Sequence, residues 1–207
     1  MIDLSAGKRR YRLFWGIVTI AVLIGLCSSC LSSPAIETSA IDNLIAEATT
    51  RESDGDFASA IEIYLDGLVK FPNAPRLLYN LAIVYAKSGA YHDSLTVLER
   101  LNGITNHTNT KYLNALAGIA SYSGNLEIAQ ECWKTVLEID PMDFDSRERL
   151  VDSFIESEMF EDAYYYALQA YELHHFQSWV FEKLTLLEHE TGRGSGASWK
   201  LLADSLI

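Results

Sequence analysis

Apolar residues recur at helical spacing along most of the chain, and no stretch alternates apolar and polar residues for long enough to predict a strand. A second, longer period marks the chain from residue 41 onward. Gly55, Gly89 and Gly124 are separated by 34 and 35 residues, and Gly192 follows at 68. Each of the first three glycines is followed by an aromatic residue or leucine, then a small residue, then a bulky one. This order predicts antiparallel helix pairs, with glycine at the turn and the small residue at the point of close approach.

These recurring segments resemble the tetratricopeptide repeat, a helix-turn-helix unit of about 34 residues. The repeats are expected at about residues 41–74, 75–108, 110–143 and 144–176, with a partial or capping repeat at 178–207. The pattern departs at Glu158, which replaces the turn glycine of the fourth repeat, and at Asn106, where the family has proline. The resemblance implies an all-α fold, a right-handed solenoid of helix pairs, preceded by an N-terminal signal or anchor helix.

The first 29 residues have the pattern of an export signal. Four basic residues between positions 8 and 12 precede an apolar run over residues 13–26, and small residues follow. Cys30 comes after two serines, with Leu26 four residues upstream, which resembles a relaxed lipid-attachment motif of bacterial lipoproteins, like that tolerated in spirochaetes. Cys27 directly follows Leu26, which is too large for the cleavage position. We therefore predict a signal peptide over 1–29, a fatty-acylated Cys30 and a tether over 30–40.

Two alternatives stay open for this segment, a single transmembrane helix and an ordinary signal peptide with an incidental cysteine. The basic flank favours a cytoplasmic N-terminus, so the lipoprotein and transmembrane interpretations both predict that the rest of the chain lies outside the cytoplasm. Leu31, directly after the cysteine, favours the periplasmic face of the outer membrane in a bacterial envelope.

Charge is the next constraint. The formal net charge of the chain is −12, and without residues 1–29, which hold four basic residues and one acid, it is −15. This excess argues against nucleic acid as a partner. Ten acids and two arginines lie between Glu138 and Asp162. They either form a solvated face or steer a basic or amphipathic protein partner.

Motifs for enzyme chemistry are weak. The five histidines form no HExxH pair, and Cys132 has no partner in the sequence for a metal site or a catalytic pair. The glycine-rich loop at 192–196 follows a helix and lacks the GK[ST] ending of a phosphate loop. The sequence therefore predicts no enzyme, cofactor or metal site.

The resemblance implies a concave groove lined by the first helices of successive repeats. The groove candidates that we carry over are Tyr79, Ile83, Lys87, Lys111, Asn114, Tyr122, Glu148 and Asp152, with Ile45, Thr49, Glu52 and Ile155 as further positions. The family's clamp for a C-terminal carboxylate does not carry over well. Asn80 and Lys111 fit that clamp, but Ile45, Thr49 and Ala115 stand where lysine, asparagine and arginine are needed.

The function that follows is a non-enzymatic, lipid-anchored adaptor that binds a peptide or helix of a partner protein. The rival hypothesis is an accessory lipoprotein of a periplasmic transport system, with a small molecule held near the tyrosine-rich segment. Three consecutive tyrosines, Tyr164, Tyr165 and Tyr166, cannot all face the core of one helix, so at least one is expected at the surface.

Overall fold

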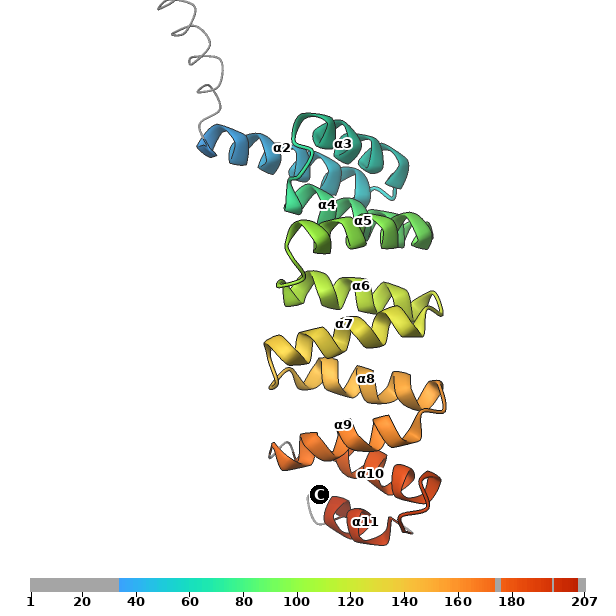
Figure 1. Ribbon diagram of the computed structural model, residues 1–207. Helices are drawn as coiled ribbons and strands as arrows, with labels where there is room; N and C mark the ends of the chain where they lie inside the picture. Colours follow the sequence, from blue (N-terminus) through green and yellow to red (C-terminus); the bar gives the residue numbers. More distant parts are fainter. Residues whose placement is uncertain (1–33, 174–175, 195, 205–207) are drawn as a thin grey trace, which may run out of the picture. The chain divides into compact units, whose positions relative to one another are not determined.

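The computed structural model describes residues 34–173, 176–194 and 196–204, and all regular structure in these ranges is helical (Figure 1). The chain forms two compact units, residues 1–46 and 47–207, so that α2 belongs partly to each. The described helices are α2 (Pro34–Ser53), α3 (Phe57–Lys70), α4 (Pro75–Lys87), α5 (Tyr91–Ile104), α6 (Thr110–Tyr122), α7 (Leu126–Ile139), α8 (Phe144–Glu156), α9 (Phe160–Glu172), α10 (Ser178–Glu190) and α11 (Ala197–Asp204).

Within residues 47–207, the helices stack in chain order. The pairs α4 with α5, α6 with α7, α8 with α9 and α10 with α11 each pack together, and each pair packs on the next (Figure 1). Short turns join the two helices of each pair and make them antiparallel. This arrangement confirms the prediction of an all-α stack of helix pairs.

The turns explain the spacing of the glycines. Gly55, Gly89, Gly124 and Gly192 have φ angles of 77°, 85°, 81° and 67°, a left-handed conformation that side chains disfavour. The amide that follows the glycine closes the turn, for example from Asn125 N to the Ala120 carbonyl at 2.8 Å. The sequence therefore places glycine where the backbone requires it.

Glu158 adopts the same turn without glycine. Its φ angle is 58°, and the Met159 amide donates to the Phe154 carbonyl at 2.8 Å, as the equivalent amide does in the other turns. The departure seen in the sequence therefore does not interrupt the stack at the fourth pair.

A small residue recurs near the start of α3, α5, α7 and α9, where the sequence predicted that neighbouring helices come close together. The residues at this position, Ala60, Ser94, Ala129 and Ala163, are all fully buried. The Ser94 hydroxyl donates to the Ala82 carbonyl at 2.7 Å, which links α5 directly to the backbone of α4. A small side chain is needed here because neighbouring helix backbones come close together.

The N-terminal boundary differs from the expected one. We expected a tether over residues 30–40, but α2 begins at Pro34, so residues 34–40 are helical. Proline suits the first position of a helix, because its φ is already helical and its missing N–H has no partner there. The predicted signal peptide at 1–29 and the predicted lipid site at Cys30 lie outside the described residues. In the part of the chain that the structure describes, no helix combines the length and apolar character needed to span a membrane.

We expect Gly124→Ala to lower the free energy of unfolding by about 1 kcal/mol, because alanine disfavours a left-handed φ. The matched control is Gly103→Ala inside α5, where no atom lies within 4 Å of the added methyl group. Gly103→Ala should raise the free energy of unfolding by about 0.5–1 kcal/mol, since alanine favours a helix more than glycine does. Urea unfolding followed by circular dichroism measures the free energy of unfolding of both variants. Equal changes in the two variants would contradict a requirement for glycine at the left-handed turn position.

Candidate functional site

A hollow of about 560 Å³ lies across the first helices of three successive pairs, α4, α6 and α8. We call it the central groove. It is lined by Tyr79, Ile83, Lys111, Asn114, Ala115, Gly118, Ile119, Trp133, Asp145, Ser146 and Arg149. Four of the predicted groove residues, Tyr79, Ile83, Lys111 and Asn114, therefore lie together at one site.

Helical spacing brings these side chains to one face. Residues 111, 114, 115, 118 and 119 follow the spacing of a single helix stripe, and residues 79 and 83 lie one turn apart. Ala115 and Gly118 occupy little volume in the middle of the stripe on α6, so the surface is hollowed there.

Lys111 and Tyr79 form the N-terminal side of the central groove. The Lys111 ammonium lies 4.3 Å from the centroid of the Tyr79 ring, within the range of a cation–π interaction. The Tyr79 ring also lies 5.4 Å from that of Tyr112. These contacts hold a positive charge at the edge of an aromatic surface.

Asn114 connects α6 to the start of α8. Its Oδ1 accepts a hydrogen bond from the Ser146 hydroxyl at 2.9 Å, and its Nδ2 donates to Asp143 at 3.4 Å. Asp143 also accepts from the Ser146 amide at 3.0 Å, as the N-cap of α8. Asn114 therefore links α6 to α8 beside the groove, and each of its side-chain polar atoms forms a hydrogen bond.

Lys87 does not line the central groove. Its ammonium pairs with Glu52 at 2.9 Å, and Glu52 also accepts from the Tyr64 hydroxyl at 3.1 Å. Burial raises the pKa of Tyr64 to about 12, and the Glu52 charge adds to this effect. Lys87 thus joins α4 to the last part of α2. On α2, Ile45 is half-buried and Thr49 is exposed.

Tyr122 also lies away from the central groove. It is the last residue of α6, its side chain is 75% exposed, and its ring lies 5.1 Å from that of Tyr91 on α5. It is two helical turns beyond Asn114, which carries it past the hollow. The structure therefore does not group Tyr122 with the other candidates.

Glu148 and Asp152 lie further along α8, where α10 supplies a counter-charge. Asp152 pairs with Lys183 of α10 at 2.5 Å. Burial raises the pKa of the half-buried Glu148, and the Asp152 charge raises it further, while Lys183 opposes both effects. Ile155 packs against the core. At the C-terminal end of the predicted groove, acidic side chains of α8 thus lie beside a lysine of α10.

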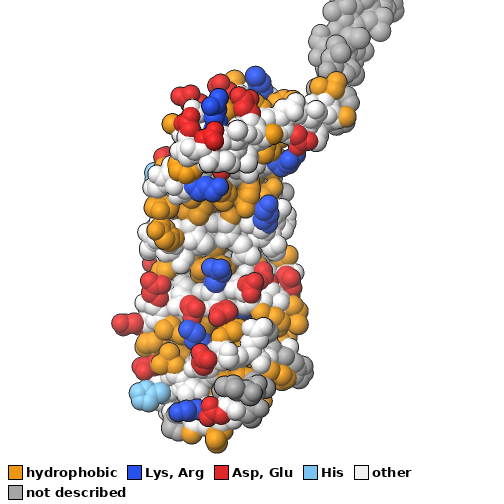
Figure 2. Space-filling view, turned by 180° about the vertical axis from the view of Figure 1, so that it is seen from behind, with side chains coloured by type: hydrophobic (Ala, Val, Ile, Leu, Met, Phe, Trp, Pro, Cys, Tyr) orange, Lys and Arg blue, Asp and Glu red, His pale blue; other side chains and the backbone are white. Residues whose placement is uncertain are grey.

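Other members of the acidic run have structural roles. Asp140 accepts from the Met142 amide at 3.0 Å, and Glu161 pairs with Arg193. Figure 2 shows acidic and basic side chains interspersed over one face, with hydrophobic side chains between them. The run of acids in the sequence therefore does not form a uniformly negative surface on this face.

Cys132 and the glycine-rich loop, which were considered for enzyme chemistry, have structural surroundings. Cys132 is buried, which raises the pKa of its thiol to about 11. The Gly196 amide of the glycine-rich loop donates to one carboxylate oxygen of Glu188 at 3.2 Å, and the Trp199 indole of α11 donates to the other at 2.7 Å. This loop is an inter-helix turn that holds the chain's own carboxylate. Within the described ranges, no three His, Cys, Asp or Glu side chains gather to hold a metal ion.

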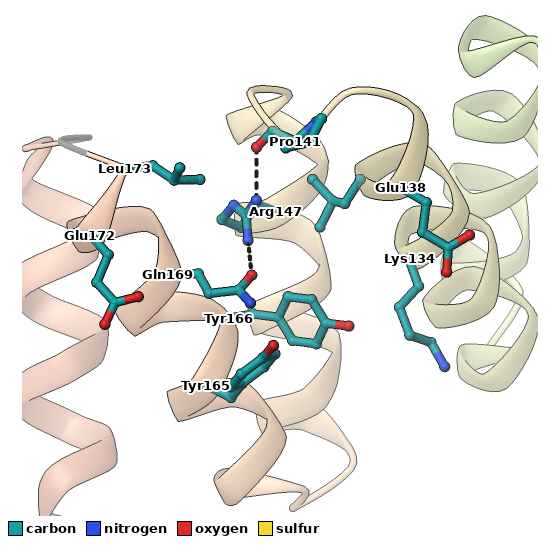
Figure 3. Close-up of a pocket in the computed structure, with 10 residues that line it drawn as sticks. Lys134, Glu138, Pro141, Arg147, Tyr165, Tyr166, Gln169, Glu172 and Leu173 are labelled. Carbon is teal, nitrogen blue, oxygen red and sulfur yellow. Dashed lines mark hydrogen bonds between the residues drawn. The ribbon is translucent and has the colours of Figure 1, made fainter.

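A second cavity, of about 490 Å³, surrounds Arg147 between α7, α8 and α9 (Figure 3). In the sequence, Arg147 stands out only as one of two arginines within the acidic run. Arg147 lies three, four and seven residues before Leu150, Val151 and Phe154, which are all buried, so it lies on the inward face of α8. This spacing could have identified Arg147 as a buried charge. Tyr165 lines the cavity and is 56% exposed, whereas Tyr164 and Tyr166 are half-buried, which confirms the prediction for the three tyrosines.

No model of a protein family matches the sequence, and no curated protein matches it. Solved structures do match. A MamA protein superposes with a TM-score of 0.66 at 15% identity, over 78% of this chain and 88% of its own. A tetratricopeptide repeat protein from Parabacteroides merdae ATCC 43184 gives 0.67 at 18%, over 80% and 66%. A putative kinesin light chain from Podospora anserina with TPR-like repeats gives 0.61 at 14%, over 81% and 94%.

These identities are low, so the likeness concerns the fold. It extends over about four fifths of the chain and agrees with the helix pairs, turns and small contact residues described above. The described part of the chain has the fold of a tetratricopeptide-type helical repeat protein.

Proposed function

We propose that the chain is a non-enzymatic binding scaffold whose central groove takes a peptide or helix of a protein partner. The observation that carries this proposal is the hollow itself, which is formed by the first helices of three successive pairs and is floored by small residues. A continuous surface on repeated helices suits an extended or helical segment.

The lining of the central groove indicates an amphipathic segment. The half-buried Ile83 and Ile119 offer apolar surface, and the buried Trp133 completes the lining, which favours burial of apolar side chains. Lys111, Arg149 and Asp145 lie beside it with charges of both signs. A segment with one apolar face and mixed charges at its edges would complement this surface.

The contacts of Asn80 weigh against a C-terminal carboxylate as the ligand of this groove. Its Nδ2 donates one of its two hydrogens to the Arg76 carbonyl at 2.8 Å, and Asn80 does not line the central groove. Ala115 lies in the groove lining where the clamp requires arginine. An internal segment of the partner is therefore the favoured ligand.

The cellular setting of this proposal rests on the sequence. We place the chain in a bacterial envelope as a lipoprotein, anchored at Cys30 after removal of residues 1–29, on the periplasmic face of the outer membrane. The basic flank, the apolar run and the serines before Cys30 support this assignment. An uncleaved single-span anchor is the alternative.

A photo-crosslinking residue at position 83 should capture a discrete partner in cells that export the chain. The same residue at position 65 on α3 is the control, because Leu65 is 44% exposed and does not line the central groove. Mass spectrometry identifies the captured segment.

A synthetic peptide of the captured segment should then bind the purified chain, and Ile119→Asp should weaken binding at least tenfold in calorimetry, because a carboxylate would replace apolar contact. Crosslinking of equal strength from both positions, or unchanged peptide affinity in Ile119→Asp, would contradict a ligand in the central groove.

For the anchor, Cys30→Ser should abolish incorporation of radiolabelled palmitate, because the acylated thiol is lost. Cys27→Ser is the matched control and should leave labelling intact. The reverse pattern would move the cleavage position to Cys27. Absence of labelling in the unaltered chain, together with an uncleaved N-terminus, would favour the single-span anchor.

A further inference from the structure

We propose that the cavity around Arg147 binds a small organic carboxylate that has an apolar or aromatic body. The site lies between α7, α8 and α9 and is separate from the central groove, so it stands independently of the proposed scaffold function.

A buried charge lines this cavity. Arg147 is 2% exposed and is the one charged side chain that is buried among the described residues. Its hydrogen-bond acceptors are neutral: Nη1 donates to Gln169 Oε1 at 2.7 Å, and Nη2 donates to the Pro141 carbonyl at 2.8 Å (Figure 3). Its Nε is buried without a hydrogen-bond partner, and no carboxylate of the described chain forms an ion pair with the guanidinium.

Such a charge is costly in a folded protein. Burial lowers the pKa of Arg147, yet a guanidinium keeps its proton at neutral pH. A buried cation with neutral partners alone loses its hydration without gaining a counter-ion. An anion bound in the cavity would supply that counter-ion.

The geometry of α8 separates this cavity from the central groove. Successive helix residues are turned by about 100° from each other, so Arg147 faces away from Ser146, which lines the groove. Arg147 points instead toward α9, where Gln169, Tyr165 and Tyr166 lie (Figure 3).

The walls of the cavity indicate what the anion is attached to. Leu137, Pro141 and Leu173 contribute apolar surface, and the rings of Tyr165 and Tyr166 lie edge to face, 5.2 Å apart. A volume of about 490 Å³ is within the usual range for small-molecule sites. An apolar or aromatic body would therefore find contacts on several sides.

The charges at the edge of the cavity favour a monoanion. Glu138 and Glu172 also line the cavity and repel a multiply charged ligand such as phosphate. Lys134 adds one cation, but its ammonium already lies 2.9 Å from Glu131. A planar carboxylate matches the planar fork of a guanidinium. A carboxylate is thus the best match among the common anions.

The probe is hydrocinnamate, a phenyl ring on a short chain ending in a carboxylate. Its matched neutral control is hydrocinnamide, and inorganic phosphate is the second control. In calorimetry with the full chain, hydrocinnamate should bind at least tenfold more tightly than either control. Equal binding of acid and amide would overturn the proposal, as would tighter binding of phosphate.

Variants separate binding from a purely structural role of the arginine. Arg147→Met should weaken hydrocinnamate binding at least tenfold. Arg100→Met is the matched control, because Arg100 also donates to a proline carbonyl between repeats, that of Pro72, but is exposed and lines neither cavity. It should leave binding unchanged. Unchanged binding in Arg147→Met would overturn the proposal.

Gln169→Glu covers the case in which Arg147→Met does not fold. It places a carboxylate beside Nη1 within the chain, so it should raise the melting temperature and still weaken hydrocinnamate binding at least tenfold. A higher melting temperature with full binding would overturn the proposal. Binding of a peptide ending in phenylalanine, without binding of hydrocinnamate, would also overturn it, because the ligand would then be a protein terminus.

Discussion

The close approach of helices at small residues is the constraint on which the whole stack depends. One helix pair cannot bury its apolar face alone, and stacking on neighbours completes the core. The fully buried Ala60, Ser94, Ala129 and Ala163 allow this approach, and Ser94 adds a hydrogen bond to the backbone of its partner helix. Because α3, α5, α7 and α9 share this small residue, successive pairs repeat one arrangement and the first helices keep a common direction (Figure 1).

The central groove is a consequence of that common direction. The first helices of three pairs present a continuous surface, and small residues on α6 hollow it. The contacts among Asn114, Ser146 and Asp143 then join two of these helices through polar atoms. A surface held in this way needs little rearrangement on binding, which reduces the entropic cost of association.

Charge acts in opposite ways at the two cavities. Beside the central groove, two acids outside its lining have partners: Asp152 pairs with Lys183, and Asp143 accepts from the Ser146 amide as a helix N-cap. Around Arg147 the cation meets only neutral acceptors among its hydrogen-bond partners. The peptide proposed for the first surface is therefore expected to carry charges of both signs, and the ligand proposed for the second a single negative charge.

The helix pairs, the turns and the small contact residues could be predicted from the sequence, because they depend on spacing and on local backbone preference. Helical spacing also puts Tyr79 with Ile83 on one stripe of α4 and Lys111 with Asn114 on one stripe of α6, whereas the meeting of the two stripes depends on the packing of the helices. Packing between helices instead fixes the pairing of Lys87 with Glu52, the position of Tyr122 beyond the hollow, and the burial of Arg147 beside Gln169. Those outcomes depend on which side chains of different helices meet, and a helical period says which face a residue occupies but not what it faces.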